Sequence, residues 1–245
     1  MALNRRSNQQ SSSPFDGATM VTMTGSSTGS KMMTVSDLAM QPGVKTPYHI
    51  HPNTEESMFV VEGELEFRVD GHRFKATAGD CVLANRGKGH GVANVSDRPA
   101  RFIAVYPSAA PEREVIDEPE LKDATPDSVS FRGRMEAFEF APGITRFDMV
   151  GDFLGAESTY FSELTFQPGA VAPNHYHPSH EESMFCLSGN LTAVYADDDN
   201  VPLEAGDMFT CEPTVRHGIY NSSDAPGKLL AIHPVLNPPP RVEVD

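Results

Sequence analysis

The chain lacks several features that would place it in a common class of protein. Its 245 residues contain no tryptophan, only three cysteines and no run of about 18 apolar residues. Without such a run we expect no transmembrane helix and no membrane partner. The cysteines Cys81, Cys186 and Cys211 show neither zinc-ribbon spacing nor a disulfide framework. The first residues also lack the apolar run of a secretory signal, so we expect reduced thiols in a cytoplasmic protein.

Basic residues are scarce as well. The chain has 19 lysines and arginines against 34 acidic residues, which gives a formal net charge of -15. The electrostatic field of this negative charge repels phosphate backbones, and we expect no nucleic-acid partner. The acidic surface is sufficiently explained by solubility.

An internal repeat dominates what the sequence does contain. Segments rich in histidine, glutamate and glycine recur about 126 residues later, and one inserted residue shifts the later matches to 127. A repeat of this length indicates a duplicated domain. The matched segments are His49-Ile50-His51 with His175-Tyr176-His177, Glu55-Glu56-Ser57-Met58-Phe59 with Glu181-Glu182-Ser183-Met184-Phe185, and His90-Gly91 with His217-Gly218.

The residues between these motifs have the pattern of short β-strands. Leu65, Phe67 and Val69 alternate with charged residues, which predicts a strand with one buried face. Asp70-Gly71 follows and predicts a two-residue hairpin turn. We therefore predict an all-β protein of two tandem jelly-roll β-barrel domains, at 17–106 and 131–236. Residues 107–130 form the predicted linker, and 1–16 and 237–245 are predicted tails, the first of them flexible.

Each repeat contains three histidines and one glutamate that a barrel can direct into its interior. Histidines two residues apart on a strand point to the same face, the glutamate follows on the next strand, and the third histidine arrives on a later one. Imidazole and carboxylate ligands suit Fe(II), Mn(II), Ni(II), Cu(II) or Zn(II). We predict up to two divalent ions per chain, held by His49, His51, Glu56 and His90, and by His175, His177, Glu182 and His217.

Other titratable residues near these motifs are not predicted to be metal ligands. Glu55 and Glu181 neighbour the predicted ligands on their strands and should point away from the metal or support it from outside. His180 has two interpretations, as a loop histidine or as a residue that contacts substrate in the second domain. His72 and His233 have no counterpart in the repeat and are expected to be structural or on the surface.

These residues resemble the two motifs of the cupin superfamily. The first motif is complete in both repeats, with Gly43 and Gly63, and Gly169 and Gly189, flanking the ligands. The second motif departs from the pattern because Asn85 and Glu212 replace its proline, which alters a turn and leaves the ligands in place. The resemblance covers roughly residues 18–106 and 135–235 and implies a bicupin, a protein with two cupin domains.

The resemblance implies three classes of function. The first is a dioxygenase similar to quercetinase-like bicupins, which would act on a small aromatic or enolisable substrate with O₂. Fe(II) is then the favoured metal, and Glu56 or Glu182 would also serve as the catalytic base. The second is a non-redox isomerase or lyase, because Cys211-Glu212-Pro213 through Asn221 is similar to the bicupin isomerase of bacilysin biosynthesis. The third is a non-enzymatic small-molecule-binding cupin. A homodimer is also expected from the family.

Overall fold

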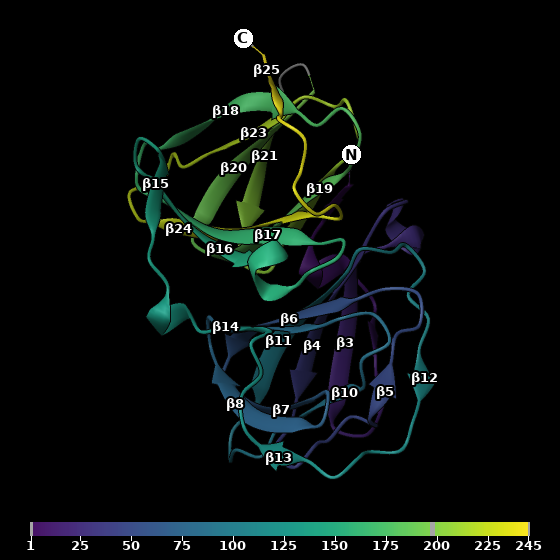
Figure 1. The fold of residues 1–245 in the computed structure, drawn as a ribbon. Coiled ribbons are helices and arrows are strands. Elements are labelled where there is room, and N and C mark those ends of the chain that lie inside the picture. The colour runs from purple at the N-terminus through teal and green to yellow at the C-terminus, as the bar shows by residue number, and fades with distance from the viewer. Residues whose placement is uncertain (1, 197–198, 245) are drawn as a thin grey trace.

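The computed structural model describes residues 2–196 and 199–244 and is built almost entirely from strands. Figure 1 shows two similar domains stacked on each other, with the N-terminal half of the chain in the lower one. This confirms the predicted all-β fold of two tandem domains. Among the described residues, four short 3₁₀ helices interrupt the strands: η1 (Arg6–Asn8), η2 (Ser26–Thr28), η3 (Arg132–Arg134) and η4 (Asp152–Leu154).

The first domain consists of two facing sheets. The seven-stranded sheet has the order β14 (Val129–Ser130), β9 (Cys81–Ala84), β6 (Glu56–Glu62), β11 (Ala100–Tyr106), β4 (Thr34–Met40), β3 (Ala18–Thr24) and β2 (Ser11–Ser12). The six-stranded sheet has the order β12 (Glu114–Val115), β5 (His49–Ile50), β10 (His90–Ala93), β7 (Glu64–Val69), β8 (His72–Thr77) and β13 (Lys122–Asp123).

The second domain repeats this plan. Its seven-stranded sheet has the order β1 (Ala2–Asn4), β22 (Met208–Cys211), β19 (Glu182–Ser188), β24 (Gly227–His233), β17 (Tyr160–Phe166), β16 (Ile144–Val150) and β15 (Phe138–Ala141). Its five-stranded sheet has the order β21 (Asp199–Glu204), β20 (Asn190–Tyr195), β23 (His217–Tyr220), β18 (Val171–Tyr176) and β25 (Val242–Glu243).

The prediction of closed barrels needs correction. Throughout residues 2–196 and 199–244, strand pairing leaves each domain as two separate sheets. Buried apolar side chains between the two sheets join them in place of hydrogen bonds, among them Leu65, Phe67 and Val92 in the first domain. Each domain is therefore an open two-sheet jelly roll, whose interior still receives side chains from both sheets.

The long strands of the seven-stranded sheets are buried on both faces. On β6, Met58 and Val60 point into the core of the first domain, whereas Phe59 belongs to a separate core shared by both domains. Phe185, its counterpart in the repeat, lies in the same shared core. Because both faces are covered, the strand has a continuous apolar sequence instead of an alternating one. The two domains are thus packed together through the outer faces of their seven-stranded sheets.

The segments predicted as tails are paired into the sheets. Strand β1 pairs with β22 of the second domain, and β25 pairs with β18 near the C-terminus (Figure 1). Part of each predicted tail is thus a short strand that covers a sheet edge, which would otherwise expose unpaired backbone groups. Within the predicted linker, β12, β13 and β14 add to sheets of the first domain. The domain boundaries themselves stay a prediction.

The hairpin between β7 and β8 forms where the sequence predicts it. Asp70 and Gly71 both have positive φ, of 48° and 79°, which is the geometry of a type I′ turn. The corresponding turn of the second domain includes Asp197 and Asp198, which lie outside the described residues.

No helix within the described part of the chain is long and apolar enough to cross a membrane.

Candidate metal centres

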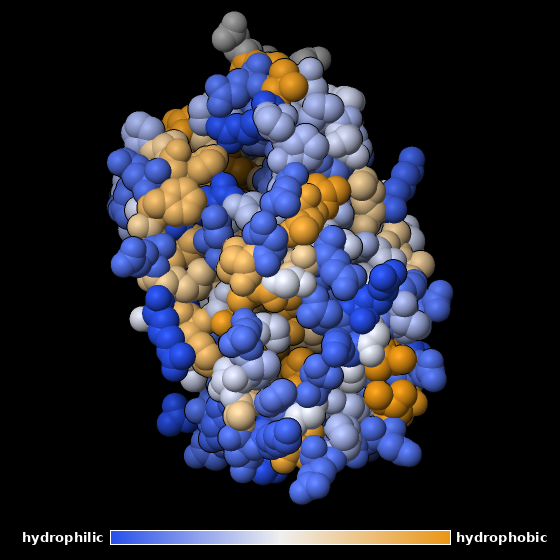
Figure 2. Space-filling model, viewed as in Figure 1, coloured by the Kyte–Doolittle hydropathy of each residue, from blue (hydrophilic) through white to orange (hydrophobic). Residues whose placement is uncertain are grey.

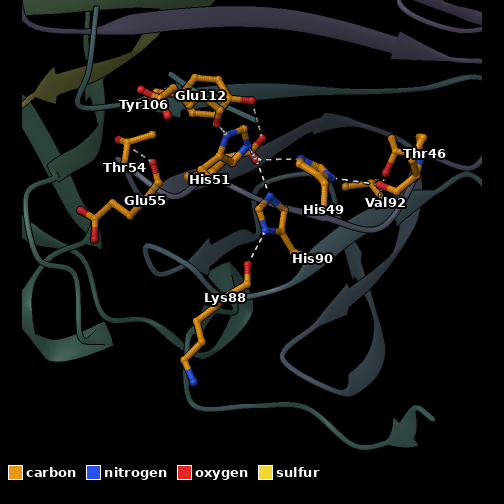
Figure 3. Close-up of polar contacts among 12 residues, drawn as sticks. Thr46, His49, His51, Thr54, Glu55, Lys88, His90, Val92, Tyr106 and Glu112 are labelled. Atoms are coloured by element: carbon orange, nitrogen blue, oxygen red, sulfur yellow. Dashed lines mark hydrogen bonds and ion pairs between the residues drawn. The ribbon is translucent and has the colours of Figure 1, made fainter. Parts of the chain in front are cut away.

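The first centre lies between the two sheets of the first domain. Residues His49 on β5 and His90 on β10 are direct partners in the strand pairing, so their side chains emerge together. Glu56 begins β6 on the opposite sheet. Its Oε2 atom lies 2.7 Å from Nε2 of His90, 3.1 Å from Nε2 of His51 and 4.0 Å from Nε2 of His49. Figure 3 shows the three imidazole rings converging on one point. All four predicted ligands are therefore brought together.

The second centre repeats this geometry. His175 on β18 is the strand partner of His217 on β23, and Glu182 begins β19 on the facing sheet. The Oε2 atom of Glu182 lies 2.8 Å from Nε2 of His217, 2.9 Å from that of His177 and 3.4 Å from that of His175. The ligand atoms of each set lie within 4.8 Å of one another, and all eight residues are buried.

Backbone carbonyls hold four of the six histidines in one orientation. The Nδ1 atoms of His49, His90, His175 and His217 each lie 2.8–3.0 Å from the carbonyl oxygen two residues earlier in the chain. Nδ1 of His51 instead faces the carbonyl of Glu112. Each Nδ1 therefore donates a proton outward, which leaves the lone pair of Nε2 directed into the centre. This outer hydrogen bond is the usual support of a metal-binding histidine, so these residues fit a bound metal.

The charges of both centres favour a cation. Burial alone raises the pKa of Glu56 and Glu182, but the surrounding histidines hold the pKa of each carboxyl well below its usual range. Both glutamates are therefore ionised at neutral pH. Burial lowers the pKa of His49 to about 3, so this imidazole is neutral. Glu56 and Glu182 outweigh burial and raise the pKa of His51 and His217, so each carboxylate draws positive charge to its centre. A carboxylate beside imidazole nitrogens is a donor set that suits divalent transition metals.

Glu55 points away from the first centre, as the strand geometry predicts (Figure 3). The carboxylate of Glu55 accepts hydrogen bonds from the backbone N–H groups of Glu157 and Ser158 in the second domain, at 2.7 and 2.9 Å. Glu181 reciprocally accepts hydrogen bonds from the loop at residues 30–32 in the first domain. The neighbour of each metal-binding glutamate thus joins the two domains.

Three residues beside the centres were not predicted from the sequence to contact the ligand residues. Tyr106 donates a hydrogen bond to Oε1 of Glu56 at 2.9 Å. His233 takes the equivalent position in the second domain, 3.8 Å from Oε1 of Glu182, and lies 3.2 Å from the buried His180. Tyr106 and His233 are 127 residues apart, the same offset as the later matches of the repeat, and this offset could have indicated that they occupy equivalent positions. A search for identical residues does not find the pair because the two residues differ. His180 lies in the loop between β18 and β19, as one of its two interpretations has it, and is buried there. His233 is buried beside the centre, so it is not a surface residue.

Each centre opens into a cavity. The cavity of the second domain measures about 410 Å³ and that of the first about 290 Å³. Both are within or near the range of small-molecule sites. In Figure 2 the upper domain is hollowed, with hydrophobic residues inside and hydrophilic ones at the rim. Each metal centre therefore adjoins a space that a small organic molecule can fill.

A duplicated two-sheet jelly roll with one histidine–glutamate centre per repeat defines a two-domain metal-binding protein of the cupin type. The model of the Cupin domain family, Cupin_2, matches residues 37–106 and 162–233, more than half of the chain. The chain belongs to this family and contains the domain twice.

Curated relatives include enzymes of different chemistry. The chain is 24% identical over 210 residues to quercetin 2,3-dioxygenase of Bacillus subtilis, covering 66% of this chain and 62% of that one. It is 27% identical over 99 residues to the tetracenomycin polyketide synthase protein TcmJ of Streptomyces glaucescens, covering 40% and 66%. It is 32% identical over 82 residues to the oxalate decarboxylase OxdC of Bacillus subtilis, covering 31% and 21%. The alignments thus span less than two thirds of each relative's own length.

Solved structures confirm the fold over the whole chain. The oxalate decarboxylase of Lactobacillus farciminis in its formate complex superposes with a TM-score of 0.82 at 15% identity, covering all of this chain and 88% of that one. The oxalate decarboxylase of Bacillus subtilis at pH 4.6 superposes with a TM-score of 0.80 at 15% identity, covering all of this chain and 78% of that one. At this identity the likeness shows the bicupin fold and carries no activity with it.

Proposed function

We propose that the protein is a metal-dependent dioxygenase that acts on a small aromatic or enolisable substrate. The observation that carries this proposal is a four-residue metal centre beside an apolar cavity, found in both domains. The three histidines and one glutamate of each centre would hold a divalent ion, which would supply the chemistry between a substrate oxygen and O₂. We favour Fe(II), with Mn(II), Ni(II), Cu(II) and Zn(II) as alternatives, and up to two ions per chain at the eight predicted ligands.

The protein residues have defined parts in this proposal. The metal, when bound, supplies Lewis acidity and open coordination positions. Glu56 and Glu182 are the proposed bases, because each is ionised and presents its Oε2 atom to the centre of the site. The hydroxyl of Tyr106 holds Oε1 of Glu56 by a hydrogen bond and so directs Oε2 toward the metal and substrate. The apolar walls exclude water from the activated substrate.

A non-redox isomerase or lyase is the second candidate. The second cavity supports it because His233 lies on its wall, 3.8 Å from Glu182 and hydrogen-bonded to His180. A carboxylate and an imidazole on one side of a substrate can move a proton between two carbon or oxygen atoms without O₂. The similarity to an oxalate decarboxylase agrees with this class as well. A non-enzymatic small-molecule-binding cupin is the third candidate.

The experiment that separates these classes is O₂ uptake by the metal-loaded protein. Flavonols and other enolisable aromatics are supplied under air and under nitrogen, and product formation is followed in parallel. The proposal predicts O₂ consumption in step with substrate loss, which disappears in the double variant Glu56→Gln, Glu182→Gln. Each single variant identifies the active domain. Turnover under nitrogen moves the assignment to an isomerase or lyase, and tight binding without turnover moves it to a binding protein.

Location and assembly are also proposals. The three cysteines are free and buried, which agrees with a reducing compartment, and we propose a cytoplasmic protein. We also propose a homodimer, which light scattering coupled to size-exclusion chromatography tests directly by giving twice the chain mass of 26.6 kDa.

A further inference from the structure

The two cavities share their metal ligands but differ in their other walls. Arg146 on β16 and Tyr160 on β17 line the second cavity. By the repeat offset of 126 they correspond to Met20 and Thr34, which line the first cavity. The larger cavity is therefore also the more cationic one. The same set of metal ligands therefore adjoins two cavities with different linings.

An arginine reaches each cavity from the segment that follows the last long strand of its domain. We call these segments the straps, residues 107–115 after β11 and 234–243 after β24. Arg113 of the first strap lines the first cavity and Arg241 of the second strap lines the second. The two straps occupy equivalent places, because β12 pairs with β5 and β25 pairs with β18.

The second strap is built to hold its arginine in a fixed place. Three consecutive prolines, Pro238 to Pro240, precede Arg241 and line the cavity with it. Proline fixes φ, so this segment loses little entropy when it is ordered. Directly after Arg241, Val242 pairs with Tyr176 on β18, next to the metal-binding His175. The guanidinium group is thus presented to the cavity by a stiff segment anchored at both ends.

The charges that line the second cavity are predominantly positive. Among the described residues, Glu182 is the only acidic side chain that lines it, against Arg146 and Arg241. A divalent ion on the centre increases this excess. Arg146 is already paired with Asp148 at 2.7 Å, whereas the partner of Arg241 is Glu243, whose side chain is 64% exposed. An exposed ion pair is weak, so Arg241 is the cation available to a ligand.

The rest of the wall is apolar. The ring of Phe140 lies 5.3 Å from the guanidinium carbon of both Arg146 and Arg241. Leu164, Phe166, Ile219 and Leu229 continue the apolar lining toward the metal centre. A cavity of about 410 Å³ with this lining is too large and too apolar for a two-carbon acid. It suits a ring-sized apolar body with one negative end.

We infer that the second cavity binds an amphipathic organic acid, with its carboxylate on Arg241 and its apolar body beside the metal centre. The inference rests on the proposed function and deepens it by naming the chemical class of substrate. Arginine is suited to this role because its planar group donates two parallel hydrogen bonds to a carboxylate.

Isothermal titration calorimetry of the full-length, metal-loaded protein tests the inference with two probes of equal shape. The probes are 2-naphthoate and the neutral 2-naphthamide. The wild-type protein should bind the carboxylate about ten-fold more tightly than the amide. In Arg241→Gln this preference should fall to near one, while the affinity for the amide is kept. Arg98→Gln, at an exposed arginine that lines neither cavity, serves as the control and should keep the preference.

Several results would overturn the inference. A carboxylate preference that survives in Arg241→Gln places the negative end on the metal or on Arg146. A preference that is lost in Arg113→Gln instead places the ligand in the first cavity. Equal affinity for both probes, or no binding of 2-naphthoate, removes the proposed class of ligand. Metal content is measured for every variant, so a lost centre is recognised. If 2-naphthoate binds through Arg241 but the flavonols and other enolisable aromatics give neither O₂ uptake nor turnover, the proposed function is wrong and the ligand assignment still holds.

Discussion

The replacement Glu55→Ala should weaken the contact between the domains without disturbing either metal centre. The carboxylate of Glu55 is buried and accepts two hydrogen bonds from backbone N–H groups of the other domain, at 2.7 and 2.9 Å. Hydrogen bonds to a charged group contribute about 1.5–3 kcal/mol each, which sums to about 3–6 kcal/mol if both donors stay dry. Glu157 and Ser158 are exposed, so water partly replaces the lost acceptor. We therefore expect a loss of about 2–3 kcal/mol in the free energy of unfolding.

Urea denaturation followed by circular dichroism measures this loss. Glu120→Ala, at an exposed residue, is the matched control and should stay within about 0.5 kcal/mol of the wild type. Glu181→Ala should cost at least as much as Glu55→Ala, because its partners include the buried hydroxyl of Ser30 at 2.6 Å. Metal content should remain unchanged in both variants. An unaltered unfolding midpoint in both would refute the assignment of these glutamates to the domain contact.

Three further changes test other parts of the structure. Tyr106→Phe removes the hydrogen bond to Glu56 and should weaken metal binding at the first centre about ten-fold, measured by competition with a chelator; unchanged affinity would contradict the role given to the hydroxyl. Arg68→Met removes the donor to the buried carbonyl of Thr46 and the ion pair with Glu118, and should lower the free energy of unfolding by about 2–4 kcal/mol, whereas the exposed Arg73→Met should not. The three thiols are buried, and burial raises their pKa values, to about 12 for Cys186. Ellman's reagent at pH 8 should therefore react with them only in denaturant. Fast reaction of the native protein would show that a thiol is exposed.

The ligand residues could be predicted because the sequence presents the same histidines and glutamate twice at matched spacing. Histidines two residues apart on a strand share a face whatever surrounds them, and the repeat presents the same pattern twice. The hairpin at Asp70 and Gly71 was predictable as well, since its turn depends on two adjacent residues. These features need no knowledge of the tertiary arrangement.

Features that depend on contacts between distant segments could not be predicted. The pairing of β1 with β22 joins residues about 200 positions apart, and nothing in the three residues Ala2–Asn4 indicates a strand. The roles of Glu55 and Glu181 follow only once the two domains are packed against each other. Arg113 and Arg241 are offset by 128, because the straps differ in length, so a search at 126 or 127 passes over them.

The metal content of the purified protein tests the central claim most directly. Elemental analysis after loading with Fe(II) without oxygen should give about two ions per chain, and His49→Ala or His175→Ala should each lose about one of them. His177→Ala should likewise lose about one ion, whereas His72→Ala, at a histidine outside both centres, should keep two. A metal content that is the same in wild type, His49→Ala and His175→Ala would contradict the account.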